Sequence, residues 1–204
     1  MHVVGLLGGV ASGKSLVAAQ LAQLGAGVLD ADRAGHEVLR LPQVEAVVRA
    51  RWGDQVFGPD GRIDRSRLAR IVFAANPEGS RQRKYLEQLT HPEIGRLLAR
   101  QAAEFQAAGK PVAVLDAPLL MEAGWDKLCD KLIFVEAPAQ ARLDRAQRRG
   151  WKEQDFQARQ RAQHSLELKR QRADLIVDNS GPPEAIKAQV ERIWQSLVGP
   201  ERTD

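Results

Sequence analysis

Residues 8–15 read Gly8-Gly9-Val10-Ala11-Ser12-Gly13-Lys14-Ser15 and match the pattern G-x-x-x-x-G-K-[ST]. A short apolar run precedes them, and apolar residues follow at the helical spacing i, i+4, i+7, namely Val17, Leu21 and Leu24. This strand–loop–helix setting lets backbone N–H groups converge on an anion at a helix N-terminus. The stretch therefore predicts a loop for nucleotide phosphates, in which an exposed Lys14 reaches the β- and γ-phosphates and Ser15 holds Mg²⁺.

The rest of the chain alternates apolar runs with helical patterns. Four further runs are continuously apolar, as strands covered on both faces of a parallel sheet are: 27–29, 112–115, 132–135 and 175–177. Helical patterns separate these runs, and one of them starts after Pro182-Pro183, where proline suits the first turn of a helix. This order predicts an α/β fold with a doubly wound, mostly parallel sheet.

Two stretches depart from a plain alternation of strands and helices. About eighty residues separate the second apolar run from the third, which is far more than one crossover helix needs. We expect residues 35–110 to form an inserted helical subdomain for the acceptor substrate, and residues 141–172 to form a helical lid. The ranges 1–34, 111–140 and 173–204 then make up the nucleotide-binding core, with a frayed tail from Gly199 onward.

The net charge of the 204-residue chain is +4, but it is unevenly placed. Ten Lys/Arg and four Asp/Glu give the window from Arg142 to Arg172 a charge of +6, so the remainder sums to −2. A local cluster suits a polyphosphate ligand better than a long duplex. Aromatic residues make up only 5% of the chain, whereas single-stranded nucleic acids need stacking surfaces. We therefore expect no nucleic-acid partner.

Composition and the pattern of apolar residues indicate where in the cell the protein is expected. No stretch approaches 18 consecutive apolar residues, so we expect no membrane-spanning helix. The first strand begins within two residues of Met1, which leaves no room for a signal peptide. The single cysteine, Cys129, has no partner for an internal disulfide and suits the reducing cytoplasm. Nothing in the chain indicates an obligate protein partner.

Three aspartates follow predicted strands. Asp30 and Asp32 close the second run, at the edge where ligands of parallel sheets bind, and strand alternation points both to one side. A carboxylate there is placed to accept the proton of an attacking hydroxyl, although aspartate also starts helices as an N-cap. Asp116 follows the third run and suits the orientation of Mg²⁺ or its water shell, although aspartate after a strand is also common in turns.

The lid window contains a run of arginines at helical spacing. Arg142, Arg145 and Arg149 share one helical face, and Arg145 and Arg148 share another. Guanidinium groups on a lid neutralise charge on a transferred phosphoryl group, whereas a solvated basic face is the usual interpretation of such a run. The spacing does not choose the arginine that acts.

One histidine stands at an unusual place. His91 precedes Pro92, and proline disfavours helical backbone at the residue before it. The pair therefore predicts a boundary between two elements, and a single histidine at such a junction is typical of a structural role.

Taken in order, these motifs resemble the dephospho-CoA kinase family over most of the chain. The matching segments are Gly8 to Ser15, Asp30-Ala31-Asp32, Phe57-Gly58-Pro59-Asp60-Gly61-Arg62-Ile63-Asp64-Arg65, His91-Pro92-Glu93-Ile94, Asp116-Ala117-Pro118-Leu119-Leu120-Met121-Glu122 and Asp178-Asn179-Ser180-Gly181. The resemblance implies transfer of the ATP γ-phosphate to the ribose 3′-hydroxyl of dephospho-CoA. The products are then CoA and ADP, in the last step of CoA synthesis, with Mg²⁺ accompanying ATP.

The resemblance also assigns roles residue by residue. It implies Asp32 as the catalytic aspartate, acting with Lys14 and with the lid arginines Arg145 and Arg149. The implied ATP-binding residues are Ala11, Ser12, Gly13, Lys14, Ser15 and Leu16. The implied acceptor-binding residues are Asp32, His91, Pro118 and Leu119, and the metal residues are Ser15 and, through water, Asp116.

Three positions depart from the family pattern. Ala11 stands in place of a usual glycine, and we expect its φ to be below zero. Leu16 replaces a usual hydroxyl residue, which predicts modestly weaker nucleotide binding, and Met121 replaces a usual phenylalanine.

Two other functions stay open from the sequence. A kinase of another small hydroxyl acceptor, such as a nucleoside, shares the loop, the aspartate and the lid. A nucleotide-dependent switch or nucleic-acid-binding protein is an alternative of another class, but the chain lacks the guanine-reading motif Asn-Lys-x-Asp.

Overall fold

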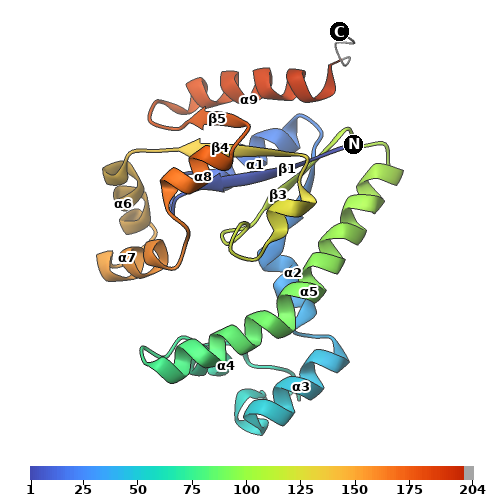
Figure 1. Cartoon of the computed structure of the whole chain (residues 1–204), viewed down its shortest axis with the longest axis vertical. Helices are drawn as coiled ribbons and strands as arrows, with labels where there is room; N and C mark the ends of the chain where they lie inside the picture. Colours follow the sequence, from blue (N-terminus) through green and yellow to red (C-terminus); the bar gives the residue numbers. More distant parts are fainter. Residues whose placement is uncertain (200–204) are drawn as a thin grey trace. The chain divides into compact units, whose positions relative to one another are not determined.

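The computed structural model describes residues 1–199, so the predicted tail beyond Gly199 lies outside the described residues. The chain forms two compact units, and Figure 1 labels most of their helices and strands. The first comprises Met1–Asp30 and the chain from Arg100 onward, and the second comprises Ala31–Ala99. The second unit thus starts and ends earlier than the predicted subdomain, 35–110. The assignment of that subdomain to substrate binding stays a prediction.

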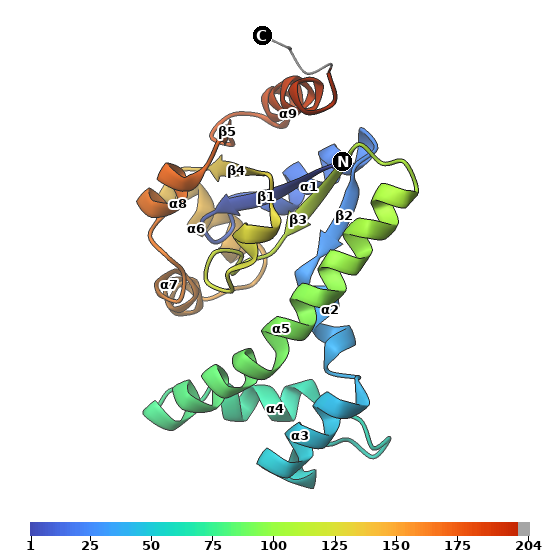
Figure 2. The same ribbon diagram turned by 45° about the vertical axis from the view of Figure 1, so that its right-hand side comes forward.

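The first unit contains one sheet, with strands β1 (His2–Gly8), β2 (Gly27–Asp30), β3 (Val112–Asp116), β4 (Lys131–Glu136) and β5 (Leu175–Asp178). They lie side by side in the order β2-β3-β1-β4-β5, and every neighbouring pair is parallel (Figure 2). All five apolar runs are therefore strands, and the predicted parallel α/β fold is confirmed. The register sets Asp30 beside Asp116 and Gly8 beside Val135, so these residues share the carboxyl edge of the sheet.

Helices cover both faces of this sheet. They are α1 (Lys14–Gln23), α8 (Leu166–Arg172), α9 (Pro183–Val198) and the last turns of α5 (Pro77–Ala107), with a short 3₁₀ helix η2 (Trp125–Leu128). Two further helices, α6 (Ala139–Arg148) and α7 (Glu153–Arg161), pack against Val10 of the loop that follows β1. α1 and α9 pack with Val4 and Leu6 of β1 in one buried cluster. α8 packs on β1 and β4 from the other face (Figure 1). Burial of each such aliphatic side chain contributes about 1.5–3 kcal/mol.

The second unit is built from helices. They are α2 (Ala31–Val38), α3 (Pro42–Trp52), a short 3₁₀ helix η1 (Asp54–Val56), α4 (Arg65–Val72) and the first turns of α5. The segment before α4 makes a turn that is closed by an isolated antiparallel bridge between Phe57 and Ile63. Asp64 caps α4, because its carboxylate accepts from the N–H groups of Ser66 and Arg67. In the described part of the chain, no helix is long and apolar enough to cross a membrane.

The boundary predicted at His91 is wrong. α5 runs from Pro77 to Ala107 and contains both His91 and Pro92. Proline removes the hydrogen bond to the carbonyl of Gln88, at a cost of about 3 kcal/mol. Ile94 and Leu98 lie one turn apart on the next part of the helix and are both buried, which offsets this cost.

The expectation that Asp30 and Asp32 share one strand is also wrong. β2 ends at Asp30 and α2 begins at Ala31, so Asp32 lies in the first turn of a helix. A carboxylate is favoured there by the positive end of the helix dipole. Asp32 is exposed. Asp32 thus lies at the start of a helix, which was the alternative to a place in the strand. Its chemical role stays a prediction.

Candidate active site

The loop between β1 and α1 has the tight backbone that its glycines predict. The N–H of Ser12 donates to the Gly9 carbonyl at 3.2 Å, and the N–H groups of Leu16 and Val17 donate to the Gly13 carbonyl. Gly13 is the N-cap residue of α1 with φ 103°. It also lies against Asn179, since a Cβ on Gly13 would be 2.0 Å from that amide nitrogen. Only glycine meets both conditions.

Ala11 has φ 57°, so the expectation of a φ below zero is wrong. It is the only non-glycine residue with positive φ in the described part of the chain. The turn that joins Ser12 to Gly9 and the start of α1 fix the backbone here, and they override the preference of the side chain. Left-handed backbone costs an L-residue roughly 1–2 kcal/mol.

Lys14 is partly buried, which corrects the prediction of an exposed side chain. Its ammonium donates to the carbonyls of Gly8 at 3.3 Å and Gly9 at 3.1 Å. Burial lowers the pKa of Lys14 to about 8. Both of these acceptors are neutral carbonyls, so the ammonium would gain stronger, charge-assisted hydrogen bonds from phosphate oxygens in the loop.

The two residues expected to hold Mg²⁺ lie together, because the Ser15 hydroxyl donates to the Asp116 carboxylate at 3.1 Å. Burial raises the pKa of Asp116, and the charge of Asp30 adds to this, whereas the Ser15 hydrogen bond and Lys14 act in the opposite direction. Hydroxyl and carboxylate oxygens are hard ligands that suit Mg²⁺. The described residues contain no group of three or more His, Cys, Asp or Glu that could hold a metal ion. An ion here would therefore need nucleotide oxygens and water as further ligands.

Two side chains hold the loop at the Ser12 carbonyl. Asn179, which directly follows β5, donates its amide to this oxygen at 2.6 Å, and Arg145 donates from α6 at 3.2 Å. Arg145 also donates to the backbone and side-chain oxygens of Asn179 at 2.9 and 3.2 Å. The sequence analysis gave Asn179 no role. Its position directly after a predicted strand could have identified it, because the same kind of position drew attention to Asp116.

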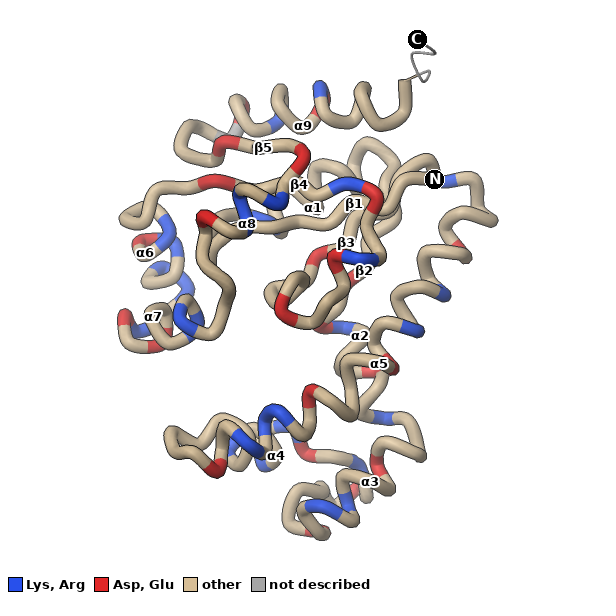
Figure 3. The backbone as a smooth tube through the Cα atoms, viewed as in Figure 1, with Lys and Arg blue, Asp and Glu red and all other residues tan. Residues whose placement is uncertain are grey.

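The arginines of α6 differ in their surroundings: some side chains lie against the loop and others are exposed to solvent. Arg142 is buried, which rules out a solvated face at this position, and it donates to Gln160 at 2.9 Å. Its guanidinium lies against the loop, because a Cβ on Gly9 would be 2.7 Å from one nitrogen. Burial lowers the pKa of Arg142. Arg148 and Arg149, at the end of α6, are exposed. Figure 3 shows the basic residues along α6, α7 and α8.

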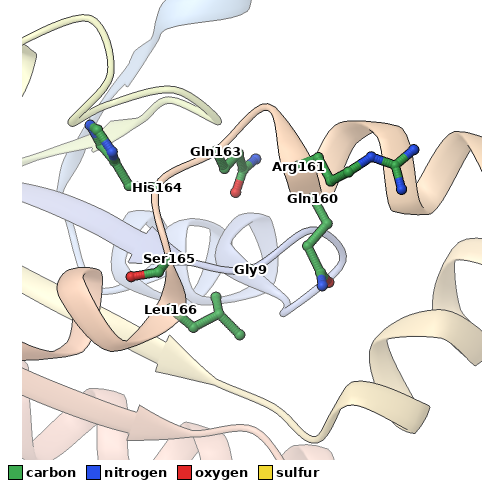
Figure 4. A pocket seen from close by; sticks show the side chains of 7 residues that line it. All are labelled: Gly9, Gln160, Arg161, Gln163, His164, Ser165 and Leu166. Atoms are coloured by element: carbon green, nitrogen blue, oxygen red, sulfur yellow. The ribbon is translucent and has the colours of Figure 1, made fainter.

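A pocket of about 300 Å³ lies beside the loop at Gly9 (Figure 4). The rest of its lining comes from the end of α7, the segment that follows it and the first residue of α8, namely Gln160, Arg161, Gln163, His164, Ser165 and Leu166. This volume is at the lower end of the range for small-molecule sites. The predicted lid window therefore does contact the phosphate loop, through Arg142, Arg145 and this pocket.

The residues that the resemblance assigned to the acceptor are spread over both units. Pro118 is exposed and Leu119 half-buried in the segment after β3 of the first unit. His91 is half-buried on α5 of the second unit, where burial lowers its pKa and Glu87 partly counters this. The roles of His91, Pro118, Leu119 and Asp32 stay predictions.

Comparison with known proteins places the chain in a family. Residues 2–184 match the family model for dephospho-CoA kinase. The dephospho-CoA kinase of Symbiobacterium thermophilum is 42% identical over 207 residues, which cover 98% of this chain and 83% of that protein. That of Thermobifida fusca is 41% identical over 200 residues, which cover 97% and 96% of the two chains.

Solved structures agree with the fold. A crystal structure of a Thermus thermophilus protein superposes with a TM-score of 0.81 at 33% identity, and the match covers 97% of this chain and 98% of that one. A shikimate kinase from Acinetobacter baumannii shares the fold, with a TM-score of 0.52 at 17% identity, and the match covers 99% of this chain and 96% of that one. From its sequence match and its fold, the chain belongs to the dephospho-CoA kinase family.

Proposed function

We propose that this chain transfers the γ-phosphate of ATP to the ribose 3′-hydroxyl of dephospho-CoA and releases CoA and ADP. The observation that carries the proposal is the phosphate loop, with Lys14 held above it and Ser15 bonded to Asp116, in a chain of this family. In the transfer, the acceptor oxygen forms a bond to the γ-phosphorus, the bond from that phosphorus to the ADP oxygen breaks, and the hydroxyl proton leaves.

The nucleotide half of the reaction belongs to the first unit. The backbone from Ala11 to Leu16 surrounds the phosphates, and Lys14 leaves the Gly8 and Gly9 carbonyls to bind them. Ser15 and, through water, Asp116 would hold Mg²⁺, which would supply positive charge to the nucleotide phosphates. Arg145 fixes the loop through the Ser12 carbonyl and Asn179, while the exposed Arg149 neutralises charge on the transferred group.

The acceptor half rests on the family resemblance. Asp32 accepts the proton of the 3′-hydroxyl, and His91, Pro118 and Leu119 contact dephospho-CoA. The substrates are then two soluble nucleotides, and we place the reaction in the cytoplasm, where a single unpaired cysteine is stable as a thiol.

An acceptor panel tests this function. The protein is incubated with Mg-ATP and either dephospho-CoA, a nucleoside, shikimate or no acceptor, and both ADP and CoA are measured. We expect ADP and CoA in equal amounts with dephospho-CoA and only background ADP otherwise. ADP release with another acceptor, and none above background with dephospho-CoA, would show that the substrate is wrong.

A further inference from the structure

The strand that leads to Asn179 lies at an edge of the sheet. β5 is the last strand in the order β2-β3-β1-β4-β5, so one side of its backbone pairs with no other strand within residues 1–199. At such an edge, every second residue has an N–H and a C=O that need other partners. Asn179 donates its own N–H to the carbonyl of Glu136 on β4, at 2.8 Å. The N–H and C=O of the residue before it, Asp178, therefore face the open edge.

One side chain of α9 satisfies both of these groups. The side-chain amide of Gln189 accepts from the Asp178 N–H at 2.9 Å and donates to the Asp178 carbonyl at 2.9 Å. A primary amide offers the same acceptor and donor as a peptide group, so Gln189 takes the place of a neighbouring strand at this position. α9 packs beside β5 (Figure 1), and Gln189 is half-buried there. The end of β5 is thus bonded on both of its sides.

The turn after β5 is closed as well. The Asp178 carboxylate accepts from the N–H of Ser180 at 2.9 Å. Asn179 therefore lies between two bonded residues, and it is only 3% exposed. From this place its amide donates to the Ser12 carbonyl at 2.6 Å. A continuous series of contacts thus runs from α9 through residues 178–180 to the phosphate loop.

We propose that Gln189 is a positioning residue for nucleotide binding, which holds Asn179 in place and, through it, the Ser12 carbonyl of the phosphate loop. This inference rests on the role of that loop in the proposed function. Without Gln189, water would bond to the Asp178 backbone, but water does not fix the end of the strand. The loop would then spend part of its time in conformations that do not bind phosphates, and the affinity falls by the fraction of time that is lost.

The test is nucleotide affinity without any acceptor. Calorimetry gives the Kd of a non-hydrolysable ATP analogue with Mg²⁺ for the wild type and for Gln189→Met, which keeps the length of the side chain but has no amide. We expect the Kd to rise roughly three- to tenfold, as for the loss of one or two hydrogen bonds. Gln195→Met is the matched control, because Gln195 is exposed on the same helix, and it should keep the wild-type Kd. An unchanged Kd in a folded Gln189→Met variant would overturn the proposal.

A double-mutant cycle separates positioning from a loss of stability. Asn179→Ala should raise the Kd by about tenfold. Adding Gln189→Met to it should change the Kd by less than about twofold, because Gln189 acts through the side chain that is already gone. The free energy of unfolding in urea should instead fall in both backgrounds alike, since the bonds from Gln189 to Asp178 do not involve that side chain. Effects on the Kd that simply multiply would show that Gln189 does not act through Asn179, and the proposal would be wrong.

The wild-type protein supplies a test that needs no variant. Coupling is reciprocal, so bound nucleotide should in turn protect the bond between Asp178 and Gln189. Amide exchange, followed by NMR, should slow at Asp178 when the ATP analogue binds, by a factor at least about three times that at Leu132. Leu132 is the matched amide, because it also donates to a side chain, Asp174, but at the amino end of β4. Equal slowing at both amides, or none, would overturn the proposal even if no variant folds.

These outcomes differ from a failure of the proposed function. A wild type that does not bind the analogue refutes the role of the loop, whereas one that binds it and shows none of these effects refutes this inference alone. Absence of phosphorylation of dephospho-CoA refutes only the acceptor, since no acceptor is present in these assays.

Discussion

The two compact units hold their candidate functional residues in different ways. In the first unit, Lys14 and Ser15 begin α1, and Arg145 lies in the last turn of α6. Lys14 donates to the Gly9 carbonyl, Ser15 to the Asp116 carboxylate and Arg145 to the Ser12 carbonyl. In the second unit, Asp32 is exposed in the first turn of α2, and His91 lies in the middle of α5. The residues proposed for the nucleotide are thus held by hydrogen bonds, whereas the roles proposed for Asp32 and His91 rest on the family resemblance. The following variants test whether the candidate residues of the two units also differ in what they do during the reaction.

Asp32→Asn should have the largest effect. The change keeps the shape of the side chain but removes the basic oxygen, so the rate of phosphoryl transfer should fall roughly 10²- to 10⁴-fold. The Kd of an ATP analogue should stay nearly the same, because the phosphate loop itself is unaltered and should supply most of the affinity for the nucleotide. Rapid-quench measurement of transfer, together with calorimetry of binding, separates the two quantities.

Asp30→Asn is the control for this variant. Asp30 ends β2 beside Asp116, so we expect it to act on the metal side of the site and to alter the Mg²⁺ dependence of the rate. If Asp30→Asn abolishes transfer while Asp32→Asn keeps the wild-type rate, the two roles are reversed. If both variants keep it, the base is another residue.

Lys14→Ala should lower turnover by on the order of 10²-fold, because it removes a positioned charge from the phosphates. It should also weaken binding of the ATP analogue, unlike Asp32→Asn. The protein should remain folded, since the fold disfavours the charged form of this lysine. Wild-type turnover in a folded Lys14→Ala variant would remove Lys14 from the mechanism.

The stability of the wild-type protein and that of Lys14→Ala should also depend differently on pH. The pKa of Lys14 is about 8 in the folded protein and 10.5 for an unperturbed lysine, so the unfolded chain binds more protons between these values. The free energy of unfolding of the wild-type protein should therefore rise across this window. Denaturant titrations at several pH values should show a smaller rise for Lys14→Ala.

Arg145→Ala should weaken ATP binding by about tenfold, because charge-assisted hydrogen bonds to the loop and Asn179 are lost. The Ser12 carbonyl keeps its bond from Asn179, which limits the effect. Arg149→Ala should instead lower the transfer rate by roughly tenfold with little change in ATP affinity. Arg148→Ala is the matched exposed control and should leave both quantities unchanged. Equal behaviour of Arg148→Ala and Arg149→Ala would show that the end of α6 is only a solvated basic face.

The strands of the first unit and the loop after β1 could be predicted from the sequence because their signals are local. Each of the five apolar runs forms a strand. The residues from Gly8 to Ser15 can be recognised as a loop because a strand precedes them and a helix follows them. The pairing of Ser15 with Asp116 follows from one rule, that parallel strands present their carboxyl ends at one edge.

The errors arose where tertiary contacts outweigh local preference. Pro92 predicts a break, but the buried side chains of Ile94 and Leu98 keep α5 continuous. The spacing of Arg142 is typical of a surface residue, yet Gln160 and the ring of Phe156 give it a buried place beside Gly9. The burial of Lys169 depends on Glu122, which is distant in sequence, so spacing could not reveal the pair.

Ala11→Gly should have the smallest effect, and it tests whether the loop is strained. Glycine relieves the left-handed cost of roughly 1–2 kcal/mol at φ 57°, but it adds roughly 0.5–1 kcal/mol of chain entropy to the unfolded state. The variant should therefore be as stable as the wild type or more stable by about 1 kcal/mol. Ala19→Gly, at an exposed position within α1, has the same entropy cost without the relief and should lose roughly 0.5–1 kcal/mol. The difference between the two variants in urea titrations measures the strain, because the change in side chain is identical. If both lose the same stability, the backbone at Ala11 is not strained, and the loop adapts to alanine as well as to glycine.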